Sequence, residues 1–338
     1  MTELQNAIAL SSRVRLARNY HDLPFSNLNN PQNAQTCIDR VRTAFSGEQP
    51  TSRYTFYMLR EMPKLEQYEL VESHLVSRDL LQSSDVGAAL IRSDKQLSIM
   101  INEEDHLRIQ AMQQGLNLQS AAETAFAAEE RLASECDFSF DTQLGYLTAC
   151  PTNTGTGMRA SVMLHLPMLT RCKQMGNVTQ SVAKLGLTIR GLYGEGSEAL
   201  GDLYQVSNQV TLGRTEEDIL EAVQAVGKQL MDMELGLRKR GDSDERIALC
   251  DQIFRSYGVM RYAMKMDASE LMQRWSDVRL GAAMGLLDIP IEVMDDLLTQ
   301  AQDAHVKHYK HQTGKTISTE QARCEILKQK LKATPQEE

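Results

Sequence analysis

Five arginines and two glutamates occupy short charged stretches beside strand-like apolar runs, and their types suggest a specific chemistry. They are Arg13, Arg15, Arg108, Arg159, Arg190, Glu104 and Glu195. An arginine stays protonated and makes planar, two-pronged hydrogen bonds to phosphate oxygens. Gathered guanidinium groups repel one another unless a polyanion neutralises them. We therefore expect a nucleoside-triphosphate pocket in which the two glutamates bind a cationic acceptor opposite the phosphates.

Each of these residues has a simpler interpretation when it is taken alone. A single arginine or glutamate is more often solvated or part of a surface salt bridge. Cys150, which ends the apolar run "YLTAC" (146–150), is on its own more often an inert buried thiol. His74 and His106 are ordinary core or surface residues when considered singly. The phosphate-pocket hypothesis rests on the joint pattern, in which the charged residues recur at the ends of predicted elements.

The composition is typical of a soluble globular chain. The 338 residues are 42% hydrophobic and 24% charged, and the net charge of −9 argues against non-specific nucleic-acid binding. No window approaches the roughly 18 apolar residues of a membrane span, and we expect no signal peptide at the N-terminus. Six scattered cysteines without a CxxC pair predict reduced thiols, a cytoplasmic location and no zinc site.

The elements that must position the charged residues change character along the chain. Strand-like runs such as "SIMIN", "YLTAC", "SVMLHLP" and "DLYQVSNQV" alternate with helical stretches in the first two-thirds. Residues 215–237 show an apolar stripe that predicts an amphipathic helix, with Thr215 and Asp218 at its N-terminal cap. The charged stretch "LRKRGDSDER" (237–246) breaks the composition, and the sequence after it reads as helical. We predict an α+β chain with a mixed domain over residues 8–238 and a helical domain over residues 239–338.

Two short motifs resemble nucleotide-binding sequences but lack a required residue. "TGKT" (313–316) ends like a P-loop, yet Tyr309 stands where that motif needs a glycine. "GEGSEA" (194–199) begins like GxGxxG, but Ala199 replaces the third glycine and no βαβ pattern surrounds it. A triphosphate pocket in this chain must therefore be built without either motif.

Four stretches together resemble the catalytic domain of the phosphagen (guanidino) kinases. They are "SSRVRLARN" (11–19), "NEEDHLR" (102–108), "CPTNTGTGMRAS" (150–161) and the run that begins "RGLYGEGSEA" (190–199). They occur in the order and approximate spacing of that family. The resemblance covers residues 8–238 and implies a catalytic domain with an antiparallel sheet flanked by helices, followed by a smaller all-helical C-terminal domain.

The resemblance also implies roles for individual residues. Glu104 and Glu195 would hold the acceptor guanidinium, and Cys150 would lie beside it. Arg108, Arg159 and Arg190 would contact the phosphoryl group in transfer. The nucleotide, ATP, would be bound by Ser11, Ser12, Arg13, Val14, Arg15, His74, Arg108, Arg159, Ala160, Ser161, Val162, Met163, Arg190, Gly191, Leu192, Tyr193, Gly194 and Glu195. Mg²⁺ would bridge the phosphates, and no protein residue is predicted as a metal ligand.

A guanidinium acceptor sets its own chemical requirement. Its pKa lies above about 12, and it must lose a proton as the N–P bond forms. Two carboxylates can orient it, and one can accept that proton as a general base. Arginines around the γ-phosphate supply charge neutralisation that is already in place. The stretch "NEEDHLR" would then hold the cation with Glu104 and the anion with Arg108.

A narrower resemblance is to the bacterial protein-arginine kinases within that family. Ten residues precede "SSRVR", where kinases for small guanidino compounds carry a further helical domain. "FRSYG" (254–258) and "SDVRLG" (276–281) resemble the C-terminal domain of this branch. The resemblance implies a role in the bacterial stress response, protein substrates with exposed arginines, delivery to a Clp-type AAA+ protease, an activator protein and a homodimer. No nucleic-acid or membrane partner is expected.

One stretch departs from that branch. "TEQARC" (319–324) stands where the branch carries Arg-Asp-x-x-Arg-Ala, a phosphoarginine-binding signature. Arg323 matches the second arginine, but Thr319 replaces the first, so a two-pronged phosphate contact is missing. Phosphoarginine binding by the C-terminal domain therefore stays open. Two alternative functions also remain: a kinase for free arginine or another small guanidino compound, and a non-catalytic phosphoarginine-binding module.

Overall fold

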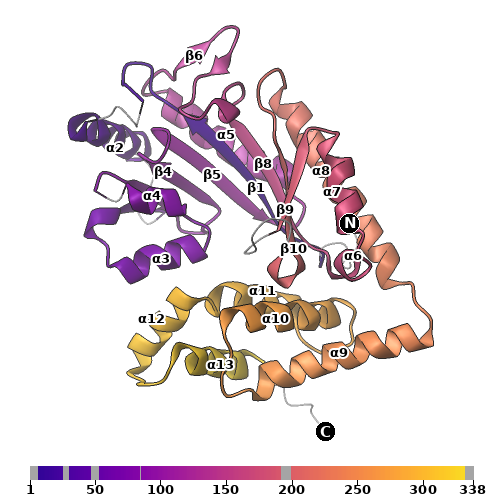
Figure 1. The fold of residues 1–338 in the computed structure, drawn as a ribbon. Coiled ribbons are helices and arrows are strands. Elements are labelled where there is room, and N and C mark those ends of the chain that lie inside the picture. The colour runs from indigo at the N-terminus through magenta and orange to yellow at the C-terminus, as the bar shows by residue number, and fades with distance from the viewer. Residues whose placement is uncertain (1–6, 26–29, 47–52, 84, 192–198, 332–338) are drawn as a thin grey trace.

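The computed structural model is built around one antiparallel sheet (Figure 1). The structure describes residues 7–25, 30–46, 53–83, 85–191 and 199–331. Within them the strands of the large sheet follow the order β2-β3-β4-β5-β1-β8-β10-β9, so that β1 lies near the centre, between β5 and β8. Their bounds are β1 (Ala9–Arg18), β2 (Tyr54–Met58), β3 (Ala88–Arg92), β4 (Leu97–Ile101), β5 (Leu107–Gln114), β8 (Met158–His165), β9 (Leu187–Gly191) and β10 (Leu203–Asn208).

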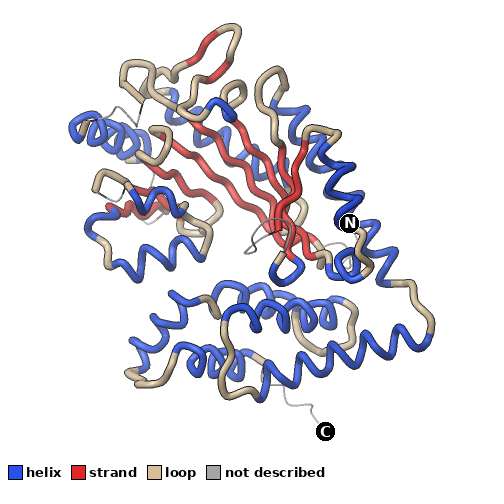
Figure 2. The backbone as a smooth tube through the Cα atoms, in the orientation of Figure 1, coloured by secondary structure: helices blue, strands red, loops and turns tan. Residues whose placement is uncertain are grey.

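One face of this sheet is apolar and packs against helices. Successive side chains of a strand point to opposite faces, and Val14, Leu16 and Ile109 point to the side where they are fully buried. The helices that cover this side include α2 (Pro31–Phe45), α5 (Leu118–Ala133) and α8 (Glu216–Arg238). Figure 2 shows the strands in red beside these helices, with the helices of the C-terminal region below the sheet. Strands and helices together form the main hydrophobic core.

The other face is covered at one end. Helices α3 (Lys64–Glu72) and α4 (Arg78–Gln82) follow the short 3₁₀ segment η2 (Leu59–Glu61) and pack over β3 and β4. There Leu59, Leu80 and Met100 belong to a small separate hydrophobic cluster. Over β5, β1 and β8 this face carries arginines and other polar side chains instead, which leaves room for a functional site.

Helix α8 confirms the amphipathic helix predicted over residues 215–237. Thr215 Oγ1 accepts a hydrogen bond from Asp218 N at 3.1 Å, and Asp218 Oδ2 accepts one from Thr215 N at 3.2 Å. This reciprocal cap satisfies two backbone donors that the first helical turn leaves unpaired. The buried stripe that includes Ile219 and Val223 packs against β8 and β10.

The described chain after Arg238 is helical. It forms α9 (Ser243–Tyr262), α10 (Ala268–Ala283), α11 (Ile291–Gln300), α12 (Asp303–Thr313) and α13 (Thr319–Lys330). These helices share a second hydrophobic core around Trp275, whose Nε1 donates to Met294 O at 2.6 Å. The change from mixed to helical structure falls close to the composition break, and a domain boundary between residues 238 and 239 remains our proposal.

Polar contacts join the helical region to the sheet region. His305 Nδ1 on α12 lies 2.7 Å from Glu72 Oε2 on α3, two helices that Figure 1 shows one above the other. Arg279 Nη1 on α10 donates to Ala7 O, next to β1, at 2.7 Å. Ser276 Oγ also donates to Asp202 Oδ2 in the segment η4 (Leu200–Asp202). The two regions therefore meet through specific side-chain contacts.

The strand predicted for "YLTAC" is wrong. The hairpin β6 (Phe140–Asp141) and β7 (Gly145–Tyr146) ends at Tyr146, and residues 147–150 form an irregular segment. Their backbone groups bond to other parts of the chain: Leu147 N donates to Ser139 O, and Ala149 N donates to Asp105 Oδ1. A segment whose donors are satisfied by side chains and loops has no need of a strand ladder.

In the stretch "TEQARC", α13 begins at Thr319, and Arg323 is almost fully buried. Arg323 donates to Ala301 O and Met266 O, both at 2.8 Å, and forms an ion pair with Asp303. Its guanidinium thus links α13 to the segment before α10, to the end of α11 and to the start of α12. The arginine that matches the signature has a structural role here.

Candidate active site

The strand register places the predicted arginines on the open face of the sheet. Arg15 on β1 stands directly opposite Arg159 on β8 and Gln110 on β5. Residues opposite each other in antiparallel strands point to the same face, and so do residues two apart in one strand. Arg108, two residues before Gln110, and Arg13, two before Arg15, therefore join this face. The sheet itself gathers arginines that are far apart in sequence.

Four of these arginines line one cavity of about 380 Å³. The predicted residues that line it are Arg15, Arg108, Arg159, Arg190, Glu104 and Cys150. The lining also contains residues that the sequence did not predict, among them Glu103, Asp105, Asp79, Thr152 and Asn153. Arg13 lies one step further along β1 and is outside the lining of this cavity. Glu195 lies outside the described residues. The structure therefore brings together six of the predicted catalytic and phosphate-contacting residues.

The arginines around the cavity are held close together at an electrostatic cost, although four carboxylates, those of Asp79, Glu103, Glu104 and Asp105, share the lining. Burial, followed by the charge of Arg108, lowers the pKa of Arg13 to about 10. Burial also holds the pKa of Arg15 well below its usual value, with further lowering by Arg13, Arg108 and Arg159. Arg15 Nε is buried and has no hydrogen-bond partner among the described residues. Because both desolvation and mutual repulsion disfavour these charges, a bound polyanion would stabilise the site.

Two neighbouring glutamates of the β4–β5 turn have different environments. Glu103 is buried, forms an ion pair with Arg108 and accepts a hydrogen bond from Ser77 Oγ. Glu104 is exposed at the cavity, and partial burial followed by the charges of Asp105 and Glu103 raises its pKa. Glu103 thus fixes the direction of Arg108, while Glu104 keeps a carboxylate facing the cavity. Sequence reasoning missed Glu103 because adjacent glutamates in a turn give no signal of which one points inward.

A side-chain network positions the segment that carries Cys150. Asp105 Oδ1 accepts from Asn19 Nδ2 and from Ala149 N, both at 2.7 Å. The Cys150 thiol lies 3.0 Å from Thr152 Oγ1 and makes a hydrogen bond with Glu104. Strand β1, the β4–β5 turn and the Cys150 segment are thereby held in one arrangement beside the cavity.

The loop from Cys150 to the start of β8 is tied down on both sides. Thr211 Oγ1 donates to Thr152 O at 3.0 Å and to Thr154 O at 2.7 Å. On the other side Ala17 N donates to Gly157 O at 2.9 Å. Gly157 has φ +62°, and an added Cβ would lie 2.7 Å from Ala17 O, so only glycine permits this close approach to β1.

Comparison with known proteins assigns this arrangement to a family. Residues 36–237 match the ATP:guanido phosphotransferase C-terminal catalytic domain, and residues 246–338 match the protein-arginine kinase McsB C-terminal domain. The protein-arginine kinase of Caldanaerobacter subterraneus subsp. tengcongensis is 41% identical over 309 residues, which cover 91% of this chain and 92% of that protein. This chain belongs to the protein-arginine kinase family of ATP:guanido phosphotransferases.

Other relatives and solved structures agree with this assignment. The protein-arginine kinase of Pelotomaculum thermopropionicum is 42% identical over 89% of this chain and 86% of its own length. A crystal structure of lombricine kinase matches with a TM-score of 0.61 and 27% identity, over 71% of this chain and 70% of that one. The duplicated taurocyamine kinase of Schistosoma mansoni, with bound transition-state-analogue components, matches with a TM-score of 0.63 and 26% identity, over 78% of this chain and 40% of that one.

These matches confirm the predicted family, the phosphagen-kinase-like fold and the prediction that the chain is a kinase. The family description also names ATP as the phosphoryl donor. No helix in the described part of the chain combines the length and apolar character that crossing a membrane requires.

The residues predicted to bind the kinase's nucleotide divide between the two faces of the sheet. Ser11, Ser161 and Met163 lie on the same face as Arg13 by register. Val14, Ala160 and Val162 point to the opposite face and their side chains are buried in the main core, so any contact of these residues with a nucleotide would have to come from their backbone. Ser12 points the same way, and its Oγ bonds to Gly115 O and Asn117 N. The assignment of the whole motif to the nucleotide does not take strand alternation into account.

The remaining predicted nucleotide residues lie at the margins of the open face. The backbone of His74 has φ +57°, and burial, followed by the charge of Arg13, lowers the pKa of its imidazole to about 4. Gln110 Nε2 donates to His74 O at 2.7 Å. Because Gln110 stands opposite Arg15 in the sheet, this bond holds His74 close to the arginines of the open face. Arg190 and Gly191 end β9, whereas Leu192, Tyr193 and Gly194 lie outside the described residues.

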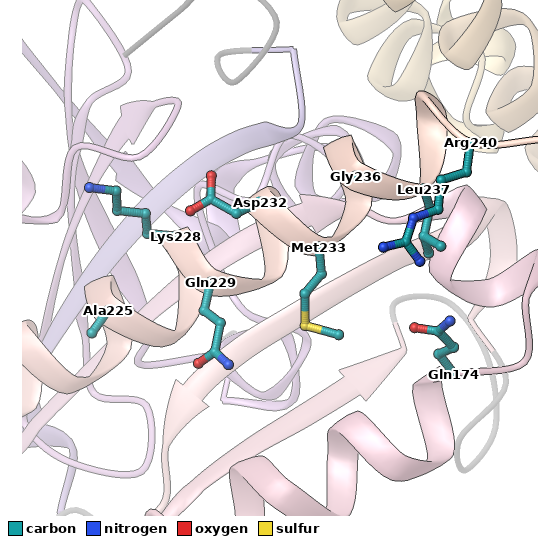
Figure 3. Close-up of a pocket in the computed structure, with 9 residues that line it drawn as sticks. All are labelled: Gln174, Ala225, Lys228, Gln229, Asp232, Met233, Gly236, Leu237 and Arg240. Carbon is teal, nitrogen blue, oxygen red and sulfur yellow. The ribbon is translucent and has the colours of Figure 1, made fainter.

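A larger cavity, of about 700 Å³, lies along α8 and does not belong to this site (Figure 3). Its lining includes Lys228, Asp232, Met233 and Arg240, and none of the residues predicted for catalysis in the kinase. Two cations and a carboxylate spread along α8 and the residues just after it do not form a phosphate cradle. The smaller, arginine-lined cavity is therefore the candidate active site.

Proposed function

We propose that this chain transfers the γ-phosphoryl group of ATP to arginine side chains of proteins. The observation that carries the proposal is the single cavity in which Arg15, Arg108, Arg159 and Arg190 face Glu104 and Cys150. A site with several guanidinium groups matches a polyphosphate, and the carboxylate matches a cationic acceptor. Phosphoryl transfer depends mostly on positioning and electrostatic stabilisation, and both can be supplied by these residue types.

In the proposed reaction each side of the cavity has its own substrate. The arginines bind the phosphates of MgATP, and Mg²⁺ arrives with the nucleotide as part of that substrate. Glu104 orients the acceptor guanidinium and accepts its proton as the N–P bond forms. At the same time the bond between the γ-phosphorus and the β–γ bridging oxygen breaks, and ADP leaves. The raised pKa of Glu104 makes it a better proton acceptor than an ordinary surface carboxylate. Glu195 is proposed as the second carboxylate.

A protein acceptor is favoured over a free guanidino compound by the relatives. The curated relatives that match over most of the chain are named protein-arginine kinases, and residues 246–338 match the C-terminal domain of that branch. We further propose that the phosphorylated proteins are directed to a Clp-type AAA+ protease in the bacterial stress response. An activator protein, a homodimer and a cytoplasmic location complete this proposal.

The test separates the protein substrate from the small one. The chain is incubated with MgATP and either free arginine or a denatured model protein, and products are measured by mass spectrometry under non-acidic conditions. We expect phosphoarginine on the protein. Phosphorylation of free arginine alone would establish the alternative kinase, and binding of phosphorylated protein without any turnover would establish the non-catalytic module.

The variant Glu104→Gln serves as the catalytic control in this assay. It keeps the size and polarity of the side chain and removes the proposed proton acceptor. We expect product formation to fall by about 10²- to 10⁴-fold, the usual contribution of general base catalysis. An unchanged rate would contradict the role of Glu104 while leaving the substrate assignment intact.

A further inference from the structure

A third cavity lies where the sheet region meets the helical region. It has a volume of about 310 Å³ and is bounded by α6 (Pro167–Arg171), the end of α8, α9 and the end of α10. We propose that this cavity is a binding site for a phosphate group, either inorganic phosphate or the phosphoryl group of a small molecule. None of the described residues that line it also lines the candidate active site.

The central observation is the guanidinium of Arg238. Its side chain is 3% exposed, and its Nε donates to Glu234 Oε1 at 3.0 Å. Nη1 and Nη2 are both buried and have no hydrogen-bond partner among the described residues. An arginine carries five N–H donors, so four remain unsatisfied in a residue that lines the cavity. Buried donors without acceptors are costly, and most are found paired in native structures.

Glu234 cannot satisfy these donors as well, because its carboxylate is already shared. Besides Arg238 Nε it accepts hydrogen bonds from Met168 N at 3.1 Å and from Leu169 N at 3.0 Å, at the start of α6. The carboxylate therefore both anchors α6 to α8 and holds Arg238 in place. The acceptors for the remaining Arg238 donors must come from the cavity, and a tetrahedral oxyanion presents oxygens that match a guanidinium in a two-pronged manner.

The charge around the cavity favours an anion over a neutral ligand. Arg171, Arg240 and Arg246 also line it, against one lining carboxylate, that of Glu245. Arg240, which follows the end of α8 and is labelled in Figure 3, lines both this cavity and the one along that helix. Even with Glu234 counted beside Arg238, the four arginines outnumber the carboxylates and form a local basic site in a chain whose net charge is −9. The volume lies at the lower limit of small-molecule sites, which fits a phosphate or a small phosphorylated compound.

A ligand here would bridge the two regions of the molecule. Arg171 and Arg238 come from elements that pack on the sheet, and Arg246 comes from the first turn of α9. A phosphate held by all three would link the position of α9 to that of α8. The site thus offers a place where a phosphorylated ligand acts on the contact between the regions, at a distance from the proposed phosphoryl transfer.

Two cysteines in the lining allow the site to be observed separately from the active site. Cys172 is exposed and Cys250 is half-buried at this cavity, while Cys150 lies in the candidate active site. The alkylation rate of each cysteine in the full-length protein is measured by mass spectrometry against inorganic phosphate, at constant ionic strength. We expect saturable, several-fold slowing at Cys172 and Cys250. Cys136, which lies in neither cavity, is the internal control and keeps its rate.

Three variants complete the test. Arg246→Ala removes an exposed cation from the lining, and Arg238→Lys keeps the charge beside Glu234 but removes the two unsatisfied nitrogens. Each is expected to raise the phosphate concentration for half-protection about tenfold, the loss of roughly one charge-assisted hydrogen bond. Lys228→Ala, an exposed cation elsewhere on α8, is the matched control and leaves this concentration unchanged. The proposal is overturned if phosphate leaves the rates of Cys172 and Cys250 unaltered, or if both arginine variants are protected like the wild type.

Discussion

The two faces of the central sheet are made from the same strands but have opposite energetic character. On β1, Val14 and Leu16 are fully buried in the main hydrophobic core. Arg13 and Arg15, which alternate with them, face the other way, and burial lowers the pKa of both guanidinium groups. The apolar face stabilises the fold through burial. The arginine face places like charges together at a cost in stability, which is expected where a site is built for a polyanionic ligand.

The largest expected effect comes from Arg15→Met, which tests the arginine face. The change removes a desolvated charge and its buried Nε while it keeps an unbranched side chain in place of the aliphatic part of the arginine. We expect kcat for phosphoryl transfer to fall by about 10²- to 10³-fold, as for removal of one preorganised donor to a transition-state charge. The free energy of unfolding should stay constant or rise. A variant that loses activity only because it unfolds, as judged by urea denaturation, would contradict the separation of the two faces.

The second prediction tests the apolar face at the neighbouring position. Leu16→Ala deletes a fully buried core side chain and should lower the free energy of unfolding by about 2–5 kcal/mol. Its specific activity, measured well below the unfolding midpoint, should stay near that of the wild type. If Leu16→Ala abolishes activity in a fully folded protein, the faces are not functionally distinct.

A smaller effect is expected where the β4–β5 turn supports the Cys150 segment. In Asp105→Asn the remaining side-chain oxygen can still accept from both Ala149 N and Asn19 Nδ2, but a neutral amide oxygen holds these donors more weakly than a carboxylate does. We expect kcat to fall about tenfold, since small misplacements of positioning groups have effects of this order or greater. Binding of MgATP, measured by calorimetry, should change little because the arginines are untouched. A large loss of nucleotide affinity would show that Asp105 supports the phosphate side instead.

The smallest effect concerns the pH dependence of the same variant. Glu104 must be ionised to hold the acceptor, so activity should fall as pH decreases through its pKa, which lies above the ordinary glutamate value. The negative charge of Asp105 contributes to that rise. In Asp105→Asn the acid limb of the kcat/KM profile should therefore move to lower pH. If the acid limb of the profile does not move in Asp105→Asn, the ionisation that controls activity belongs to a group other than Glu104.

The sequence predicted the parts of this site that depend on side-chain chemistry and strand period. The alternation of Arg13 and Arg15 with Val14 and Leu16 is enough to indicate a strand with one polar and one apolar face. The meeting of Arg15 with Arg159 could not be derived in this way, because register between distant strands is set by tertiary pairing. The irregular segment at residues 147–150 was misread as a strand for a similar reason: its apolar residues match a strand pattern, while its backbone is held by Asp105 and Ser139.

The role of Glu103 and the burial of Arg238 were also beyond the sequence. The sequence of two adjacent glutamates does not reveal which of them pairs with Arg108. The geometry of the turn determines that it is Glu103. Arg238 belongs to the charged stretch at which we placed the domain boundary, yet it is buried because α8 continues to that residue against α6. Both cases depend on how elements pack, which local patterns do not encode.

The central claim is most directly tested by measuring phosphoarginine on one denatured model protein with three forms of the chain. Wild type, Arg15→Met and Leu16→Ala are compared with MgATP at a temperature where circular dichroism shows all three to be folded. The account predicts abundant product with wild type and Leu16→Ala, and a loss of about 10²- to 10³-fold with Arg15→Met. Equal product from wild type and Arg15→Met would contradict the assignment of the arginine face to phosphoryl transfer.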